Sequence, residues 1–119
     1  MSGFRQGDIV LIPHAPYSDQ LQTKARPCLI ISSDEFNNSQ ADVVCLVISS
    51  KLRPEDPTRI DIIADRSAAF AQTGLRMSSS IKCSVIFTYQ ADLIPRVLGH
   101  LPPRLMEAAK RTVAHIIGL

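Results

Sequence analysis

The apolar residues of this chain fall into short runs that proline, serine and asparagine interrupt. The longest run, Val43–Ile48, is rich in β-branched residues and is far too short to cross a bilayer, which takes about 20 residues. Short runs of this kind, bounded by turn-forming residues, are typical of buried strands. The pattern therefore predicts a sheet of short strands and no membrane span.

The expected elements follow from these runs. We expect strands over residues 8–12, 27–32, 42–48, 59–63, 75–77, 81–88 and 95–101. Pro13 and Pro16 should end the first strand and leave a polar loop over 13–25. Residues 34–40 are expected to form one helical turn or a loop, and 72–74 a turn. After Pro102, apolar residues recur at helical spacing as far as Gly118, which predicts a helix.

Five to seven strands with one C-terminal helix predict a mainly β (α+β) fold, a small β-barrel or strongly coiled sheet. The length of 119 residues favours a single domain over 1–119, because two halves would each have a marginal core. The formal net charge is only +2, from 13 basic and 11 acidic residues. A nucleic-acid partner would therefore require the basic groups to be concentrated locally.

Three cysteines, Cys28, Cys45 and Cys83, lie inside apolar segments. Their odd number and the absence of a CxxC pair predict reduced, buried thiols in a cytoplasmic protein. The N-terminus has an acidic residue before any apolar stretch, so we expect no signal peptide. No metal or other cofactor is expected, the alternative being a site of Cys28 and Cys83 completed by His14 or His100.

Two places combine polar groups with the end of an apolar strand. In the first, Lys24 and Arg26 precede the strand that Pro27 opens, and the planar guanidinium fork suits phosphate. In the second, Ser49, Ser50, Lys51 and Arg53 follow the run 43–48. A solvated arginine and an ordinary serine-rich loop are the alternatives. If residues 28–31 and 43–48 pair antiparallel, Arg26 and Ser49 meet at one sheet edge and form a candidate phosphodiester site.

Five segments, in this order, resemble the MazF/PemK family of toxins from toxin–antitoxin pairs. They are Gly7-Asp8-Ile9-Val10, residues 24–32, Val47-Ile48-Ser49-Ser50, Thr73-Gly74-Leu75 and Leu98-Gly99-His100-Leu101. The resemblance spans Gly7 to Gly118. It implies an SH3-like barrel (MazF/Kid/CcdB-like) with a C-terminal helix. It also implies a homodimer whose grooves receive single-stranded RNA, a cognate antitoxin, and a ribosome-independent endoribonuclease activity.

The resemblance also implies roles for individual residues. Arg26 and Ser49 become the catalytic pair, with serine where relatives commonly have threonine. Lys82 and Ser84 stand where some members have an Arg-x-Asp motif. The implied reaction uses the 2′-hydroxyl of the RNA without a metal and leaves a 2′,3′-cyclic phosphate and a 5′-hydroxyl. The candidate RNA-binding residues are Lys24, Ser50, Lys51, Arg53, Lys82, Tyr17 and His14.

Two other functions remain open from the sequence. The serines at positions 49 and 84 are compatible with a barrel that binds RNA or antitoxin without turnover. A gyrase poison of the CcdB type would share the barrel but acts through a C-terminal tryptophan. This chain contains no tryptophan and ends in Ile117-Gly118-Leu119, which argues against that alternative.

Overall fold

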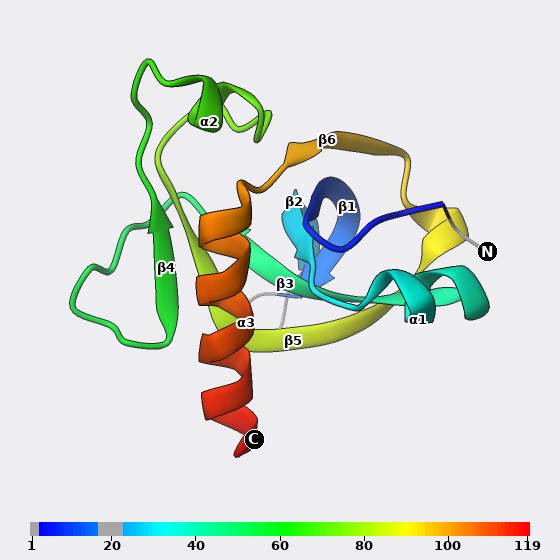
Figure 1. Cartoon of the computed structure of the whole chain (residues 1–119). Coiled ribbons are helices and arrows are strands. Elements are labelled where there is room, and N and C mark those ends of the chain that lie inside the picture. The colour runs from blue at the N-terminus through cyan, green and yellow to red at the C-terminus, as the bar shows by residue number, and fades with distance from the viewer. Residues whose placement is uncertain (1–2, 17–22) are drawn as a thin grey trace.

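The computed structural model describes residues 3–16 and 23–119. Within these residues the strands are β1 (Asp8–Pro16), β2 (Thr23–Ile30), β3 (Asp42–Ser49), β4 (Arg59–Ile62), β5 (Ser79–Gln90) and β6 (Arg96–His100). They form one curled sheet in the order β4-β5-β3-β2-β1-β6 (Figure 1), and every neighbouring pair is antiparallel. The predicted mainly β fold with a C-terminal helix is confirmed.

The helices are α1 (Asp34–Ser39), α2 (Ala68–Ala71), the 3-10 turn η1 (Ala91–Leu93) and α3 (Pro103–Ile117). The hydroxyls of Ser33 and Ser67 cap α1 and α2 by accepting from backbone N–H groups. Helix α3 begins with proline and ends at Gly118, whose φ of 86° is left-handed, as the sequence predicts. In the part of the chain that the structure describes, each helix is too short or too polar to span a membrane.

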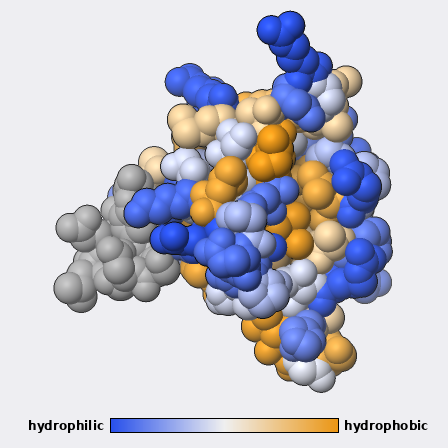
Figure 2. All heavy atoms as spheres, turned by 90° about the vertical axis from the view of Figure 1, so that its left-hand side faces the viewer, coloured by the Kyte–Doolittle hydropathy of each residue, from blue (hydrophilic) through white to orange (hydrophobic). Residues whose placement is uncertain are grey.

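Two apolar clusters lie on opposite faces of the sheet, because neighbouring residues of a strand point in opposite directions. One contains Ile9, Leu29, Leu46 and Ile81 of the strands, together with Leu101, which precedes α3, and Met106 and Ala109 on α3. The other contains Val10, Ile12, Cys28, Val43, Cys45 and Val47, with Ala91 and Ile94 near η1. Figure 2, which views the β4 side, shows hydrophobic surface at its lower end, where α3 ends; Ile117 and Leu119 are exposed there.

The first strand differs from its predicted extent. β1 continues through Pro13 to Pro16, and β2 begins at Thr23, so the predicted loop over 13–25 is wrong at both ends. The β1–β2 register shifts between Ile12 and Ala15, and such an irregularity accommodates a proline that has no N–H to donate. The strand predicted over 75–77 is also wrong, because these residues are irregular. Residues 34–40 contain the short helix α1.

The three cysteines are buried and free, as predicted. Burial raises the pKa of the Cys45 thiol to about 12 and that of Cys83 to about 11. Burial, followed by repulsion from Cys45, raises the pKa of Cys28 as well. At neutral pH the three side chains are therefore neutral and contribute to the two apolar clusters as small hydrophobic groups.

Stability should consequently fall as the pH rises above about 9. The thiols stay protonated in the folded chain, whereas they ionise above their ordinary pKa of 9.0 in the unfolded chain, so alkaline pH favours unfolding. Each thiol should contribute on the order of 1.4 kcal/mol per pH unit until its folded pKa is reached. Urea unfolding at several pH values measures this slope. A Cys83→Ala variant should show a shallower slope, and an unchanged slope would contradict the assignment.

Candidate active site

A cleft of about 1030 Å³ lies where β2 begins and β3 ends. It is built from those strand ends, the β3–β4 connector, the loop before β5, β5 itself and β6. The lining residues are Leu11, Ala25, Arg26, Pro27, Ile48, Ser49, Ser50, Lys51, Arg53, Arg59, Gly74, Leu75, Arg76, Met77, Ser79, Lys82, Arg96, Val97 and Leu98. Segments that are distant in the sequence therefore share one surface.

Arg26 on β2 and Ser49 on β3 line the same cleft from neighbouring strands. The two strands are antiparallel, as expected, and their register pairs Cys28 with Val47. If this register is extended by two residues along each strand, Arg26 comes level with Ser49. Both are partly buried and both line the cleft. A guanidinium and a hydroxyl are thus held on neighbouring strands at one end of the sheet.

Lys82 of β5 completes this surface from the next strand. Its register partners are Val47 on β3 and Arg59 on β4, and directly paired residues share a face of the sheet. Because alternate residues of a strand also share a face, Arg26, Ser49, Lys82 and Arg59 belong to the same face. Lys82 is only 7% exposed and lines the cleft. Ser84, two residues further along, is exposed and does not line the cleft.

The lining is strongly one-sided in charge. More than half of the chain's 13 basic residues contribute to it, and no carboxylate does so among the described residues. The basic residues are Arg26, Lys51, Arg53, Arg59, Arg76, Lys82 and Arg96. A cleft lined by one sign of charge raises the local concentration of the opposite ion. The small net charge of the chain is therefore unevenly distributed, and the cleft favours anions.

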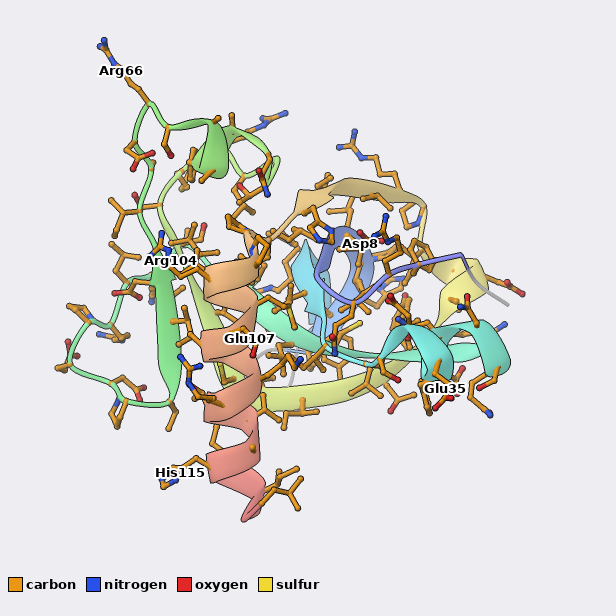
Figure 3. All side chains as sticks on the ribbon, in the orientation of Figure 1. Asp8, Glu35, Arg66, Arg104, Glu107 and His115 are labelled. Carbon is orange, nitrogen blue, oxygen red and sulfur yellow. The ribbon has the colours of Figure 1, made fainter. Side chains whose placement is uncertain are left out.

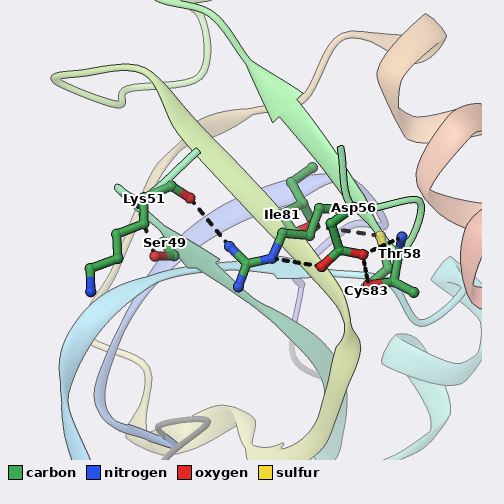
Figure 4. Close-up of polar contacts among 7 residues, drawn as sticks. Ser49, Lys51, Asp56, Thr58, Ile81 and Cys83 are labelled. Carbon is green, nitrogen blue, oxygen red and sulfur yellow. Dashed lines mark hydrogen bonds and ion pairs between the residues drawn. The ribbon is translucent and has the colours of Figure 1, made fainter. Parts of the chain in front are cut away.

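Hydrogen bonds fix the connector that follows Ser49 (Figure 4). The Ser49 Oγ accepts from the Lys51 N–H at 3.1 Å, and Arg59 Nη1 donates to the Lys51 carbonyl oxygen at 3.2 Å. Arg59 Nε also lies 3.5 Å from Asp56 Oδ2. The Thr58 hydroxyl and N–H donate to Asp56 Oδ1 at 2.7 and 2.9 Å, which lowers the pKa of that carboxyl. Since Ser49 Oγ accepts in this bond, its own hydrogen remains able to donate into the cleft.

The structure brings together most of the predicted site residues. Ser50, Lys51 and Arg53 line the cleft with Arg26, Ser49 and Lys82. His14 is exposed on β1 and is not part of the lining. Tyr17 lies outside the described residues, as does the side chain of Lys24, whose backbone pairs with Ala15.

Three basic residues that were not predicted from the sequence also line the cleft, namely Arg59, Arg76 and Arg96. Arg59 opens a predicted strand, so a correct strand order would have placed it beside Lys82. Arg76 directly follows the motif segment Thr73-Gly74-Leu75, and Arg96 lies two residues before the segment that begins at Leu98, but neither segment indicated a charged site. Among the described residues, no group of three or more His, Cys, Asp or Glu side chains is arranged to hold a metal ion.

The fold is similar to those of several solved structures. An endoribonuclease from Mycobacterial species, solved in complex with its cognate antitoxin, has a TM-score of 0.75 at 22% identity, covering 98% of this chain and 97% of that chain. MazF from Deinococcus radiodurans has a TM-score of 0.76 at 14% identity, with coverages of 98% and 97%. The Mycobacterium tuberculosis toxin MazF-mt6 has a TM-score of 0.70 at 20% identity, with coverages of 94% and 97%. The chain therefore has the fold of the MazF toxins.

The sequence itself identifies the family. The family model described as PemK-like, MazF-like toxin of type II toxin–antitoxin system matches residues 5–117. The chain belongs to this toxin family, which confirms the resemblance found in its sequence motifs. A search of curated proteins found no match.

Proposed function

We propose that this chain is an endoribonuclease toxin that cleaves single-stranded RNA in its basic cleft. The observation that carries the proposal is the position of Arg26 level with Ser49, in a cleft that basic residues dominate. Membership of the MazF/PemK toxin family supports it, as does the similarity of the chain's fold to that of an endoribonuclease from Mycobacterial species.

In the proposed reaction the nucleophile comes from the substrate. The 2′-oxygen of a ribose attacks the adjacent phosphorus and loses its proton, the bond to the 5′-oxygen breaks, and that oxygen gains a proton. The products are a 2′,3′-cyclic phosphate and a 5′-hydroxyl. This route requires no metal, since neither the nucleophile nor the leaving group depends on one.

The residues of the cleft would then act on charge and position. Arg26 would donate hydrogen bonds to the non-bridging oxygens, where negative charge increases in the transition state. Ser49 would donate to a phosphate oxygen or align the 2′-hydroxyl. Ser50, Lys51, Arg53 and Lys82 would contact the backbone of the RNA, which gives affinity without sequence preference.

The proposal extends to partners. A cognate antitoxin would cover the basic cleft with an acidic segment, which the charge of the lining favours; one similar structure holds its antitoxin. The working unit would be a homodimer in the cytoplasm, with RNA held in grooves to which both copies contribute.

Incubation of the purified chain with single-stranded RNA tests the proposal. We expect cleavage that is equally fast with and without EDTA, and products that end in a 2′,3′-cyclic phosphate and a 5′-hydroxyl. Mass spectrometry of the fragments identifies both ends. Loss of activity in EDTA would contradict the metal-free route, and 3′-hydroxyl products would contradict attack by the 2′-oxygen.

A second candidate is a binding module without turnover. It is favoured by the departures at two positions: Ser49 replaces the family's usual threonine, and Ser84 is exposed outside the cleft instead of supplying a carboxylate. Tight binding of RNA with no products under any of the conditions above would support the module and overturn the enzyme.

A further inference from the structure

The cleft continues beyond Arg26 and Ser49 onto an arm formed by loop residues 72–77 and β6. Gly74, Leu75, Arg76 and Met77 of the loop line it, together with Arg96, Val97 and Leu98 of the strand. We propose that this arm is a second RNA subsite, which holds a nucleotide flanking the scissile phosphate. The inference rests on the proposed function, because that function supplies the RNA strand.

In the arm, the loop and β6 are in direct backbone contact. A Cβ on Gly74 would lie 2.0 Å from the Leu98 carbonyl oxygen, and one on Gly99 would lie 2.3 Å from the Gln72 carbonyl oxygen. The His100 N–H donates to that same Gln72 oxygen at 2.8 Å. These two glycines belong to the motif segments 73–75 and 98–101, so the structure gives both motifs a role in joining loop to strand.

The loop is also held from within. The fully buried Thr73 donates its hydroxyl hydrogen to the Phe70 carbonyl oxygen at 2.7 Å, and its Oγ1 accepts from the Leu75 N–H at 3.1 Å. Arg76 follows Leu75 directly, so these hydrogen bonds also restrict the position of the Arg76 backbone. A site held in place before the ligand arrives loses less entropy on binding.

The arm offers what an unpaired nucleotide needs. Arg76 and Arg96 are exposed cations with planar forks that match phosphate oxygens. Met77 is 57% exposed and Val97 47% exposed, and apolar side chains beside cations form surfaces on which unstacked bases rest. A nucleotide here would place its phosphate on the arginines and its base on Met77 and Val97.

RNA fits this arm better than an acidic peptide does. An RNA strand whose scissile phosphate lies between Arg26 and Ser49 continues along the same cleft, so its next nucleotides reach the arm without any new surface. The exposed side chains of Met77 and Val97 can pack against the face of a base, but they cannot form a hydrogen bond or an ion pair with a carboxylate. Binding at the arm should therefore depend on the length of the RNA.

Fluorescence anisotropy with two non-cleavable 2′-O-methyl RNAs tests this dependence. The Arg76→Ala/Arg96→Ala variant should bind a labelled decanucleotide about tenfold more weakly than the wild type, and a labelled dinucleotide equally well. The slope of log K against log salt should fall by about 1.4 for the decanucleotide, since each phosphate contact on a single strand contributes about 0.7.

The matched control removes the same charge elsewhere. Arg66 extends away from the molecule beside α2 (Figure 3), and Arg111 is exposed on α3; neither lines the cleft. The Arg66→Ala/Arg111→Ala variant should bind both RNAs as the wild type does. Equal effects of the two double variants would overturn the subsite, as would equal weakening of both RNAs or weakened binding of an acidic peptide alone.

Different experimental results would contradict the proposed subsite and the proposed reaction. Length-dependent binding through Arg76 and Arg96 by a chain that yields no products would support the subsite and overturn the cleavage reaction. Cleavage with no change in decanucleotide binding by the double variant would support the reaction and overturn the subsite. Because both arginines are exposed, the variant should unfold at the same urea concentration as the wild type.

Discussion

Replacing Arg26 by alanine should lower the rate of RNA cleavage by at least about 100-fold while leaving the fold intact. A donor aimed at charge that develops in the transition state is worth about that much in rate. Arg26 is the cation level with Ser49 on the neighbouring strand, and its side chain is only partly buried. Its loss therefore removes charge at the phosphate without opening either apolar cluster.

Single-turnover cleavage with enzyme in excess measures this effect, because it separates the chemical step from RNA binding. Arg26→Lys keeps the charge but not the planar fork, so its rate should lie between those of the wild type and the alanine variant. Arg111→Ala, which removes a charge from the exposed side of α3, should cut at the wild-type rate. Wild-type cleavage by Arg26→Ala would mean that the site is wrongly assigned.

The antiparallel pairing of β2 with β3, which brings Arg26 and Ser49 to one cleft, could be predicted because it depends on two local facts. Each residue adjoins a strongly apolar strand, and a short connector joins the two strands, which favours an antiparallel hairpin. The helix α3 was equally predictable, since its apolar spacing lies between an initiating proline and Gly118. In these cases the pattern within one segment, or two adjacent segments, determines the structure.

The remaining parts of the site depend on contacts that no single segment encodes. β1 runs through Pro13 because the register with β2 shifts there, and a register shift is a property of two strands. Residues 75–77 have a strand-like composition, yet they are irregular and follow residues 72–74, which contact β6 at Leu98 and Gly99. Arg76 and Arg96 reach the cleft only through this packing, so the sequence could not single them out.

The contact between the loop and β6 predicts a large effect on stability. In Gly99→Ala the new Cβ would lie within 2.4 Å of the Gln72 oxygen and of the carbonyl carbon and oxygen of Thr73. All three are backbone atoms, so no side chain can rotate to make room. β6 must move away from the loop, and the bond from the His100 N–H to Gln72 must lengthen or break. We expect the free energy of unfolding to fall by about 3 kcal/mol.

Urea unfolding of Gly99→Ala beside Gly3→Ala separates this clash from the general cost of replacing glycine. Gly3 has a φ of +77°, and a Cβ there meets no atom within 4 Å, so its substitution should cost only the left-handed strain of about 1 kcal/mol. If Gly99→Ala and Gly3→Ala had the same free energy of unfolding, the close contact between the loop and β6 would not contribute to stability. The same contact joins the loop that carries Arg76 to the strand that carries Arg96. Without urea, where the Gly99→Ala protein remains folded, we therefore expect it to bind the decanucleotide more weakly than the wild type does. Affinity for the dinucleotide should stay unchanged, since Arg26 and Ser49 are positioned by β2 and β3 and not by the arm.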